Sequence, residues 1–353
     1  MAILTINSGS SSLKVAFFKE GGKRVCFNYT LAHGEEAFRD AMESLLVDLS
    51  GVQPTVIAHR FVHGGDCRKN ASILDVDEMT RLEQLAHLAP LHMPNNLRGV
   101  RWCQRYFCCP QVACFDTAFH QTMAEMAWRL PIDDRLGIRK YGFHGLSYSY
   151  IASSLPMLVG DVAQGHVLVA HLGSGASLCM LHNLQSIDTT MGFTPAGGLT
   201  MATRSGDLDP GIMLALMEKF DGAALSEQVF QKMGLVALSR GESADMLTLL
   251  QSESDEAQFA IDYFCRQVRA YIGALVAKVG SIDALVFTGG IGEHSFLVRE
   301  KICEPLRLFG FLLDLHQNEQ GHCYIHQKGS KPIVVMATDE EEMMRRYAQE
   351  HIQ

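Results

Sequence analysis

Residues 3–18 of this chain read ILTINSGSSSLKVAFF, and residues 167–180 read VLVAHLGSGASLCM. Each segment is a short apolar run, a loop of Gly and small hydroxyl residues, and a second apolar run, and Ser12-Leu13 aligns with Ser177-Leu178. Such loops present backbone N–H groups and hydroxyls to an anion without steric obstruction. The repeated pattern therefore predicts two phosphate-binding hairpins and a nucleotide held between two related halves.

Length and charge narrow the class of protein. The chain has 353 residues with 47% hydrophobic content, which is enough for more than one core and favours two domains. Its formal net charge is −9, whereas a nucleic-acid or anionic-membrane partner would favour clustered Lys and Arg. We expect a small-molecule substrate, no nucleic acid and no membrane partner.

The cysteines indicate a reducing compartment. There are ten, including the adjacent Cys108-Cys109, with no regular disulfide framework. Cys103 and Cys114 flank this pair, which leaves two interpretations, a metal site or small apolar side chains in a helix and the following strand. The absence of paired Cys-x-x-Cys spacing favours the second. No secretory signal precedes Ser8, so we expect a cytoplasmic protein.

Residues 162–187 contain no Asp, Glu, Lys or Arg and could suggest a membrane span. His166, His171 and His182 interrupt the run, so a buried hairpin explains it better.

Short apolar runs alternate with helical patterns along the chain, which predicts an α/β fold with buried parallel strands. The expected strands are 56–58, 112–115, 166–170, 282–287 and 333–336. A helix is predicted over 257–279, ended by Gly280, and another over 340–351. The Gly-rich turn 288–293 is expected to open a helix and to form a nucleotide site.

The domain boundary is predicted near residues 148–154. This gives an N-terminal domain of residues 1–150 and a nucleotide-binding domain of residues 151–339. The terminal helix, residues 340–353, is expected to pack back on the first domain.

Two arginines have the chemistry to bind carboxylate and phosphoryl oxygens. Arg60 follows the strand 56–58, and Arg204 lies in the sequence TRSGD. For either one alone, a surface salt bridge is the competing interpretation.

Asp116 and Glu340 are candidate magnesium ligands. Each comes directly after or shortly after a predicted strand, where open parallel sheets present ligand-binding loops. Mg2+ requires only one or two carboxylates together with phosphate oxygens and water. The competing interpretation for Glu340 is stabilisation of the helix dipole in an acidic first turn.

His144 lies between glycines and could donate a hydrogen bond to a transition-state oxygen. With fifteen histidines in the chain, only the Gly-rich settings distinguish His144 and His171 from structural histidines.

Eight motifs in this order resemble those of the acetate/propionate kinase family and span nearly the whole chain. They are NSGSSSLK (7–14), HRFVHGG (59–65), LAPLHMP (88–94), FDTAFHQ (115–121), YGFHG (141–145), MGFTP (191–195), TRSGD (203–207) and GGIGE (289–293).

The resemblance implies a duplicated two-domain acetate and sugar kinase/actin-like (ribonuclease H-like) fold with an interdomain cleft. It also implies a homodimer that phosphorylates a short carboxylate with ATP and Mg2+ (or Mn2+). The implied catalytic residues are Arg60, Asp116, His144 and Arg204, with Asn7, Asp116 and Glu340 at the metal. The implied carboxylate site comprises Arg60, Val62, Leu91, His92, Phe143 and Pro195. The implied nucleotide site comprises Asn7, Ser10, Ser12, Lys14, His171, Gly173, Ser174, Gly175, Asp245, Gly289, Gly290, Ile291 and Gly292.

The chain departs from the family pattern at four places. Ser174 and His294 stand where the family usually has Asn, and Leu247 stands where it usually has an arginine against the base. The segment between Lys19 and Val56 is also short. The preferred acid and base, and the physiological direction, therefore stay open.

Three alternatives to an ATP-dependent acetate or propionate kinase remain. The first is the same chemistry with another nucleotide or pyrophosphate as donor, and the second is a nucleotide-binding relative without turnover. The third, a sugar kinase, is weaker because a hydroxyl substrate needs a general base, whereas a carboxylate is already ionised.

Overall fold

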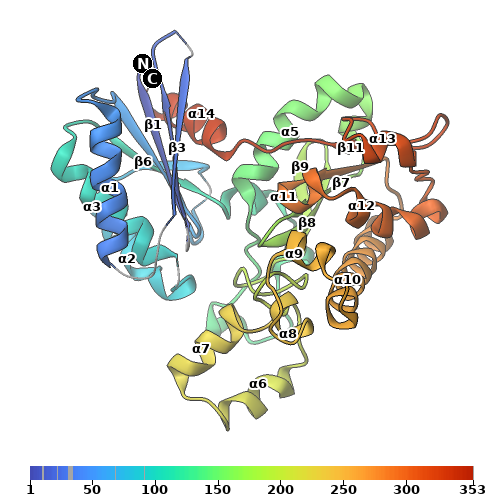
Figure 1. The fold of residues 1–353 in the computed structure, drawn as a ribbon. Coiled ribbons are helices and arrows are strands. Elements are labelled where there is room, and N and C mark those ends of the chain that lie inside the picture. The colour runs from blue at the N-terminus through green and yellow to red at the C-terminus, as the bar shows by residue number, and fades with distance from the viewer. Residues whose placement is uncertain (10–11, 22, 31–34, 68, 91, 353) are drawn as a thin grey trace. The chain divides into compact units, whose positions relative to one another are not determined.

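The computed structural model describes residues 1–9, 12–21, 23–30, 35–67, 69–90 and 92–352, and it is mixed α/β with two sheets (Figure 1). The chain forms two units. Unit 1 comprises Met1–Gln121, Gly145–Tyr150 and Asp339–Gln353, and unit 2 comprises Thr122–His144 and Ile151–Thr338. The predicted boundaries at residues 150 and 339 stay a prediction.

Unit 1 is built on a sheet with the strand order β3-β2-β1-β4-β6-β5. Its strands are β1 (Ile3–Ser8), β2 (Ser12–Phe18), β3 (Arg24–Thr30), β4 (Val56–Phe61), β5 (Ala71–Ile73) and β6 (Gln111–Phe115). Its helices are α1 (Glu35–Leu49), α2 (Val76–Gln84), α3 (Met93–Tyr106) and α14 (Glu340–Ile352), with short 3-10 segments at Ala86–Leu88 and Ala118–Thr122.

Alternating side chains of the unit 1 strands fill two cores, as expected of strands covered on both faces. Leu4, Ile6 and Ile57 pack with α1 and α3 on one face. Ile3, Val56 and Ala58 pack on the other face with Leu146 and with residues of α14: Met343, Met344, Tyr347 and Ala348. The last helix of the chain thus completes the core of the first sheet.

Unit 2 contains a sheet with the strand order β11-β10-β7-β8-β9. Its strands are β7 (Val167–Leu172), β8 (Ala176–His182), β9 (Gln185–Thr189), β10 (Ala284–Thr288) and β11 (Ile333–Val335). Its helices are α4 (Glu125–Trp128), α6 (Pro210–Met217), α7 (Gly222–Gln231), α8 (Leu235–Leu238), α9 (Met246–Gln251), α10 (Asp255–Val279), α11 (Gly289–His294), α12 (Phe296–Cys303) and α13 (Leu315–Glu319). Short 3-10 segments lie at Asp134–Leu136, Gly160–Gln164 and Glu304–Phe309, and α5 (Gly145–Val159) begins in unit 1 and ends in unit 2.

The two sheets repeat one topology. In each, an antiparallel hairpin (β1-β2, β7-β8) has a third antiparallel strand on one side and two parallel strands on the other. The unit 1 sheet has an additional edge strand, β5, which pairs antiparallel to β6. The first Gly/Ser loop connects β1 to β2, and the second connects β7 to β8. The apolar run 162–187 is the buried hairpin of unit 2 and not a membrane span, and within the described residues no helix is long and apolar enough to cross a bilayer.

The strongest helical pattern is confirmed as α10, which ends where Gly280 adopts a left-handed conformation with φ 80°. All ten cysteines are free thiols. Cys103 and Cys114 are buried, as expected of apolar side chains, but Cys108 is exposed. For Cys108 the interpretation as a core residue is therefore wrong.

Candidate active site

One group of predicted residues gathers at the carboxyl ends of β1, β4 and β6 in unit 1. Asn7 and Arg60 lie near the ends of β1 and β4, and Asp116 follows β6 directly. These strands are parallel neighbours, so their ends reach one edge of the sheet. Glu340 begins α14 and reaches the same group from the far end of the chain.

Arg60 is the centre of this group. Its Nε and Nη2 donate to Oδ2 of Asp116 at 3.0 and 2.6 Å, and its Nη1 donates to Oδ1 of Asn7 at 3.0 Å. The same Nη1 lies 3.6 Å from Oε2 of Glu340. Burial would lower the pKa of Arg60, but Asp116 and Glu340 raise it above the ordinary value. Arg60 is therefore a fixed cation within an acidic group.

Asp116 is almost completely buried, with 1% of its side chain exposed. Burial raises the pKa of Asp116 to about 6, and the guanidinium of Arg60 opposes the rise. Its Oδ2 accepts hydrogen bonds from Arg60. Its other oxygen, Oδ1, is buried and accepts no hydrogen bond of ordinary geometry from the described residues. A buried carboxylate oxygen without a hydrogen-bond partner is suited to bind an additional cation or hydrogen-bond donor.

This group fits a magnesium ion. The oxygen donors are the carboxylates of Asp116 and Glu340 with the amide of Asn7 beside them, and hard oxygen ligands are those that Mg2+ prefers. Among the described residues no cluster of three His, Cys, Asp or Glu could hold a metal ion by itself. A site with two carboxylates matches a cation that also uses substrate phosphates and water.

The first Gly/Ser loop adjoins this group. The N–H of Gly9 donates to the carbonyl oxygen of Ser12 at 2.8 Å, and exposed Lys14 on β2 pairs with Asn7 on β1. Ser10 falls outside the described residues. Of the predicted acyl-pocket residues in unit 1, Val62 is buried and His92 is half-buried at the start of α3, and Leu91 also falls outside the described residues.

A second group of predicted residues converges on Gly175 in the second Gly/Ser loop, in unit 2. A Cβ atom on Gly175 would lie 2.9 Å from Nη2 of Arg204 and 3.2 Å from Nε2 of His144. Only glycine lets the backbone approach both side chains this closely. The structure therefore brings His144, Gly175 and Arg204 together from segments far apart in the sequence.

Arg204 forms no ion pair with a carboxylate among the described residues. Burial lowers the pKa of Arg204 to about 10, and no Asp or Glu in the described part of the chain forms an ion pair with it. Its Nη1 donates to the carbonyl oxygen of buried Pro195 at 2.7 Å. A half-buried guanidinium held by a carbonyl group is suited to bind an anion, because the anion would supply the missing counter-charge.

His144 adopts an unusual backbone conformation. Its φ of 60° is left-handed, which is uncommon for a residue with a side chain, and it occupies the N-cap position of α5. Its Nδ1 lies 2.9 Å from Oγ of Ser177, and its ring stacks on His171 with centroids 4.2 Å apart. These contacts direct Nε2 toward Gly175 and Arg204.

The Gly-rich turn after β10 forms α11, as predicted, and lies close to the second Gly/Ser loop. A Cβ on Gly173 would lie 3.9 Å from the backbone nitrogen of Gly290. Glu293 stabilises this turn, since its Oε1 accepts from the N–H of Gly289 at 2.9 Å. Gly289, Gly290, Ile291 and Gly292 therefore lie beside a loop with exposed Ser174.

Two further predicted site residues, Asp245 and Phe143, lie in unit 2. Asp245 is exposed and caps α9, accepting from the N–H of Thr248 at 2.9 Å. Phe143 is buried with 1% of its surface exposed.

Four residues of these groups were missed as individual candidates in the sequence. Ser177 orients His144, and Glu341 accepts from Nδ2 of Asn7 at 3.3 Å. Asn96 accepts from the N–H of Val62 at 3.3 Å and donates to the carbonyl oxygen of Ser8 at 3.2 Å. Arg24 binds the first turn of α14. Two of the four carried a sequence signal: Ser177 lies in the repeated hairpin pattern, and Glu341 lies in the acidic run 339–342, for which a helix-dipole effect is the competing interpretation.

Comparisons with known proteins identify the family of this chain. The model of the Acetokinase family matches residues 19–346. An acetate kinase of Nitrobacter hamburgensis is 39% identical over 384 residues, covering 98% of this chain and 95% of the relative.

Two solved structures are similar over nearly their whole length. A propionate kinase from Francisella tularensis subsp. tularensis SCHU S4 has a TM-score of 0.90 at 32% identity and covers 99% of each chain. The acetate kinase of Porphyromonas gingivalis has a TM-score of 0.84 at 31% identity and covers 100% of each chain. The predicted family resemblance and the actin-like α/β fold class are confirmed.

Proposed function

This chain belongs to the acetokinase family, and from that premise we propose that it transfers the γ-phosphoryl group of ATP to acetate or propionate. A carboxylate oxygen attacks the γ-phosphorus, the bond to the β,γ-bridging oxygen breaks, and the products are an acyl phosphate and ADP. The reaction is direct, in-line and reversible.

The observation that carries this proposal is the pairing of Arg204 with His144 at Gly175. The half-buried guanidinium of Arg204, which has no carboxylate partner among the described residues, and the Nε2 of His144 both lie close to Gly175 in the Gly/Ser loop. Phosphoryl transfer depends mainly on positioning and on neutralising charge that develops on the moving group. Arg204 and His144 supply these functions, with His171, Gly173, Ser174 and Gly175 as the phosphate loop.

The residues of unit 1 complete the reaction in this proposal. Arg60 binds the carboxylate substrate, and Asp116 orients Arg60 and the substrate. Asp116 and Glu340, with Asn7, hold Mg2+ (or Mn2+), which when bound neutralises charge on the β- and γ-phosphates. Ser12 and Lys14 serve the first phosphate loop, and Ser10 belongs to the same sequence motif.

The substrates bind through apolar and Gly-rich surfaces. The motif match assigns the apolar residues Val62, Leu91, Phe143 and Pro195 to the acyl site and makes His92 a further substrate residue. The adenosine is bound by Asp245 and by the turn Gly289, Gly290, Ile291 and Gly292. An apolar pocket discriminates a single methylene by only about 1–3 kcal/mol, so the choice between acetate and propionate is left to the rate measurements below.

Two further properties follow from the family and the composition. We propose a homodimer, which is testable by light scattering on the purified chain. We also propose a cytoplasmic location, supported by ten free thiols.

The decisive experiment traps the product. The purified chain with ATP, Mg2+ and acetate should yield an acyl phosphate that hydroxylamine converts to a hydroxamate. Initial rates with formate, acetate, propionate and butyrate, each with ATP, GTP and pyrophosphate, then identify acid and donor. Absence of hydroxamate with every pair would contradict a carboxylate kinase, and product with pyrophosphate but not ATP would correct the donor alone.

A further inference from the structure

We propose that Arg24, on strand β3, is a positioning residue for the metal-binding end of α14, holding its first turn so that Glu340 is presented to Asn7 and Arg60. This inference rests on the proposed function, in which Glu340 is a metal ligand. Arg24 lies outside all eight family motifs, in the short segment between Lys19 and Val56.

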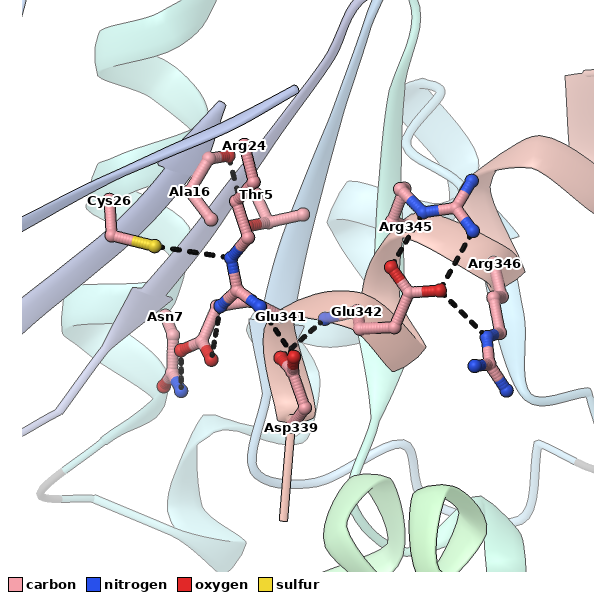
Figure 2. Close-up of polar contacts among 10 residues, drawn as sticks. All are labelled: Thr5, Asn7, Ala16, Arg24, Cys26, Asp339, Glu341, Glu342, Arg345 and Arg346. Atoms are coloured by element: carbon pink, nitrogen blue, oxygen red, sulfur yellow. Dashed lines mark hydrogen bonds and ion pairs between the residues drawn. The ribbon is translucent and has the colours of Figure 1, made fainter. Parts of the chain in front are cut away.

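The guanidinium of Arg24 uses each of its nitrogens on a different partner (Figure 2). Its Nη1 donates to the carboxylate of Asp339, its Nη2 lies 3.6 Å from Oε2 of Glu341, and its Nε donates to Sγ of Cys26 at 3.1 Å. The group also lies over the ring of Phe18, 5.2 Å from its centroid. A planar guanidinium with contacts to all three nitrogens and to an aromatic ring has a fixed orientation, and it therefore fixes the orientation of the carboxylates that it binds.

Both carboxylates held by Arg24 belong to the first turn of α14. Asp339 caps the helix, because its Oδ1 accepts from the N–H of Glu342 at 3.0 Å. Glu341 accepts from Nδ2 of Asn7 at 3.3 Å, and Figure 2 shows Arg24 and Asn7 meeting this carboxylate.

Glu340 lies between these two residues in the sequence. Its Oε2 accepts from Nδ2 of Asn7 at 3.0 Å and lies 3.6 Å from Nη1 of Arg60. Fixing the residues on both sides of Glu340 fixes the backbone from which its side chain projects.

Each acidic residue of the run 339–342 lies close to at least one arginine. Arg24 binds Asp339 and Glu341, whereas Arg345 and Arg346 bind Glu342, at 2.7 and 2.9 Å (Figure 2). Arg60 is the cation nearest Glu340. Loss of Arg24 would leave Asp339 and Glu341 without this cation, beside the proposed metal ligand.

Two roles of Arg24 predict opposite effects on metal affinity. If Arg24 only contributed charge, its neutralisation would make the turn more negative and would strengthen cation binding. If Arg24 positions Glu340, neutralisation weakens binding, since outer partners of metal ligands typically contribute about 10–100-fold in affinity.

The test compares Arg24→Gln and Arg24→Lys with Arg39→Gln. Arg39 is a matched control, because it is an exposed arginine of α1 that pairs with Asp40 and Glu43. Binding of Mn2+ in the presence of ADP is measured by electron paramagnetic resonance, and the Mg2+ dependence of acyl-phosphate formation is measured in parallel. Thermal unfolding verifies that each variant is folded.

We expect Arg24→Gln to weaken Mn2+ binding about tenfold and to raise the half-saturating Mg2+ concentration similarly. We expect kcat at saturating Mg2+ to stay within about threefold, Arg24→Lys to retain part of the affinity, and Arg39→Gln to match the parent. Unchanged or tighter Mn2+ binding in a folded Arg24→Gln overturns the inference. If that variant does not fold, Arg24→Lys decides by the same measurement, and an affinity equal to the parent overturns it.

Glu340→Gln separates this inference from the proposed function. Loss of Mn2+ binding in Glu340→Gln with normal binding in the Arg24 variants refutes only the role of Arg24. Normal binding in Glu340→Gln refutes the assignment of Glu340 as a ligand.

Discussion

The imidazole Nδ1 of His144 lies 2.9 Å from the hydroxyl oxygen of Ser177, which is completely buried on β8. This hydrogen bond joins the residue before α5 to the strand that follows the second Gly/Ser loop. With Nδ1 occupied, Nε2 is the nitrogen that faces Gly175 and Arg204. The orientation of the proposed transition-state donor thus depends on a serine without any charge of its own.

Replacing Ser177 with Ala should reduce kcat about tenfold, which corresponds to 1.4 kcal/mol of transition-state stabilisation. The imidazole would lose the partner that fixes its ring, while the carboxylate and ATP sites would keep their own contacts. We expect KM for both substrates to change less than twofold in steady-state assays of hydroxamate formation.

The matched control for this variant is Ser149→Ala. Ser149 also has a buried hydroxyl bonded to a ring-bearing side chain, Tyr347, at 2.8 Å. Both variants should lose about 1 kcal/mol of unfolding free energy, but only Ser177→Ala should lose kcat. Equal kcat in the two variants would show that Ser177 has a structural role alone.

Replacing Gly175 with Ala should reduce kcat about 100-fold or more. The added methyl group would lie 2.9 Å from Nη2 of Arg204 and 3.2 Å from Nε2 of His144, so both side chains would have to move. The distance to Nη2 of Arg204 is shorter than real Cβ contacts, so a displacement is required. Because Arg204 and His144 act on the transferring phosphoryl group in our proposal, the effect should appear in kcat and not only in KM for ATP.

Gly273→Ala is the control for Gly175→Ala. Gly273 lies within α10, and a Cβ there meets nothing within 4 Å. We expect unchanged kinetics and about 0.5–1 kcal/mol of added stability from the better helix former. A Gly175→Ala variant with the kinetics of the parent would contradict the proposed convergence of groups.

Arg60→Ala should abolish most turnover and also destabilise the fold. Removal of a group that stabilises transition-state charge typically costs about 10²–10³ in kcat. Asp116, with 1% of its side chain exposed, would lose the cation that offsets its burial, and breaking a buried pair of this kind costs about 3–5 kcal/mol.

The double variant Arg60→Ala/Asp116→Ala tests this explanation. It should recover part of the unfolding free energy measured in urea but none of the activity, because the unpaired carboxylate is removed while the proposed substrate ligand is still absent. Stability lower than that of Arg60→Ala would argue against an unpaired Asp116 as the cause.

The stability of unit 1 should fall as the pH falls from 6.5 toward 4. Burial lowers the pKa of His59 to about 4, and its hydrogen bond to Gln111 opposes the shift only in part. In the unfolded chain the pKa is near 6.5, so in this window the unfolded state binds more protons than the folded state. Unfolding free energy therefore decreases by up to about 1.4 kcal/mol per pH unit from this histidine alone.

Urea unfolding at pH 7.5 and pH 5.0 measures the effect in the parent and in His59→Gln. The parent should lose about 2 kcal/mol more than the variant between these two pH values. His63, whose pKa is also lowered to about 4, stays in both proteins and keeps some pH dependence in the variant. Parallel pH profiles would refute the assignment to His59.

The sequence predicted the elements of the fold whose signals are local. The two hairpins, the buried strands that become β4, β6, β7, β10 and β11, and the long helix α10 each carry their own apolar pattern. Asp116 directly follows the predicted strand 112–115, as expected, whereas Arg60, which was expected to follow the strand 56–58, lies inside β4 because that strand continues to Phe61. The short segment after Lys19 gave no comparable signal, and β3 and α1 were not predicted there.

The partners of the site residues could not be predicted, because they come from distant positions. Ser177 lies 33 residues from His144, and Asp339 lies 315 residues from Arg24. A serine on an apolar strand and an arginine near an exposed thiol have no local pattern that distinguishes them. For Asp245 the difference runs the other way. Motif match predicts a role at the nucleotide, but the contact in the structure is local, because Asp245 caps α9 by accepting from the N–H of Thr248.

The position of α14 has a consequence for biosynthesis. This helix covers one face of the unit 1 sheet, with Met343, Met344 and Tyr347 packed against Ile3, Val56 and Ala58, yet the ribosome makes it only after residues 151–338. Until then the nascent chain carries a finished set of strands with an uncovered apolar face, the kind of surface that chaperones bind. Glu340 arrives with the same helix, so the proposed metal site would be incomplete, and by our proposal the chain inactive, until translation of α14 has finished.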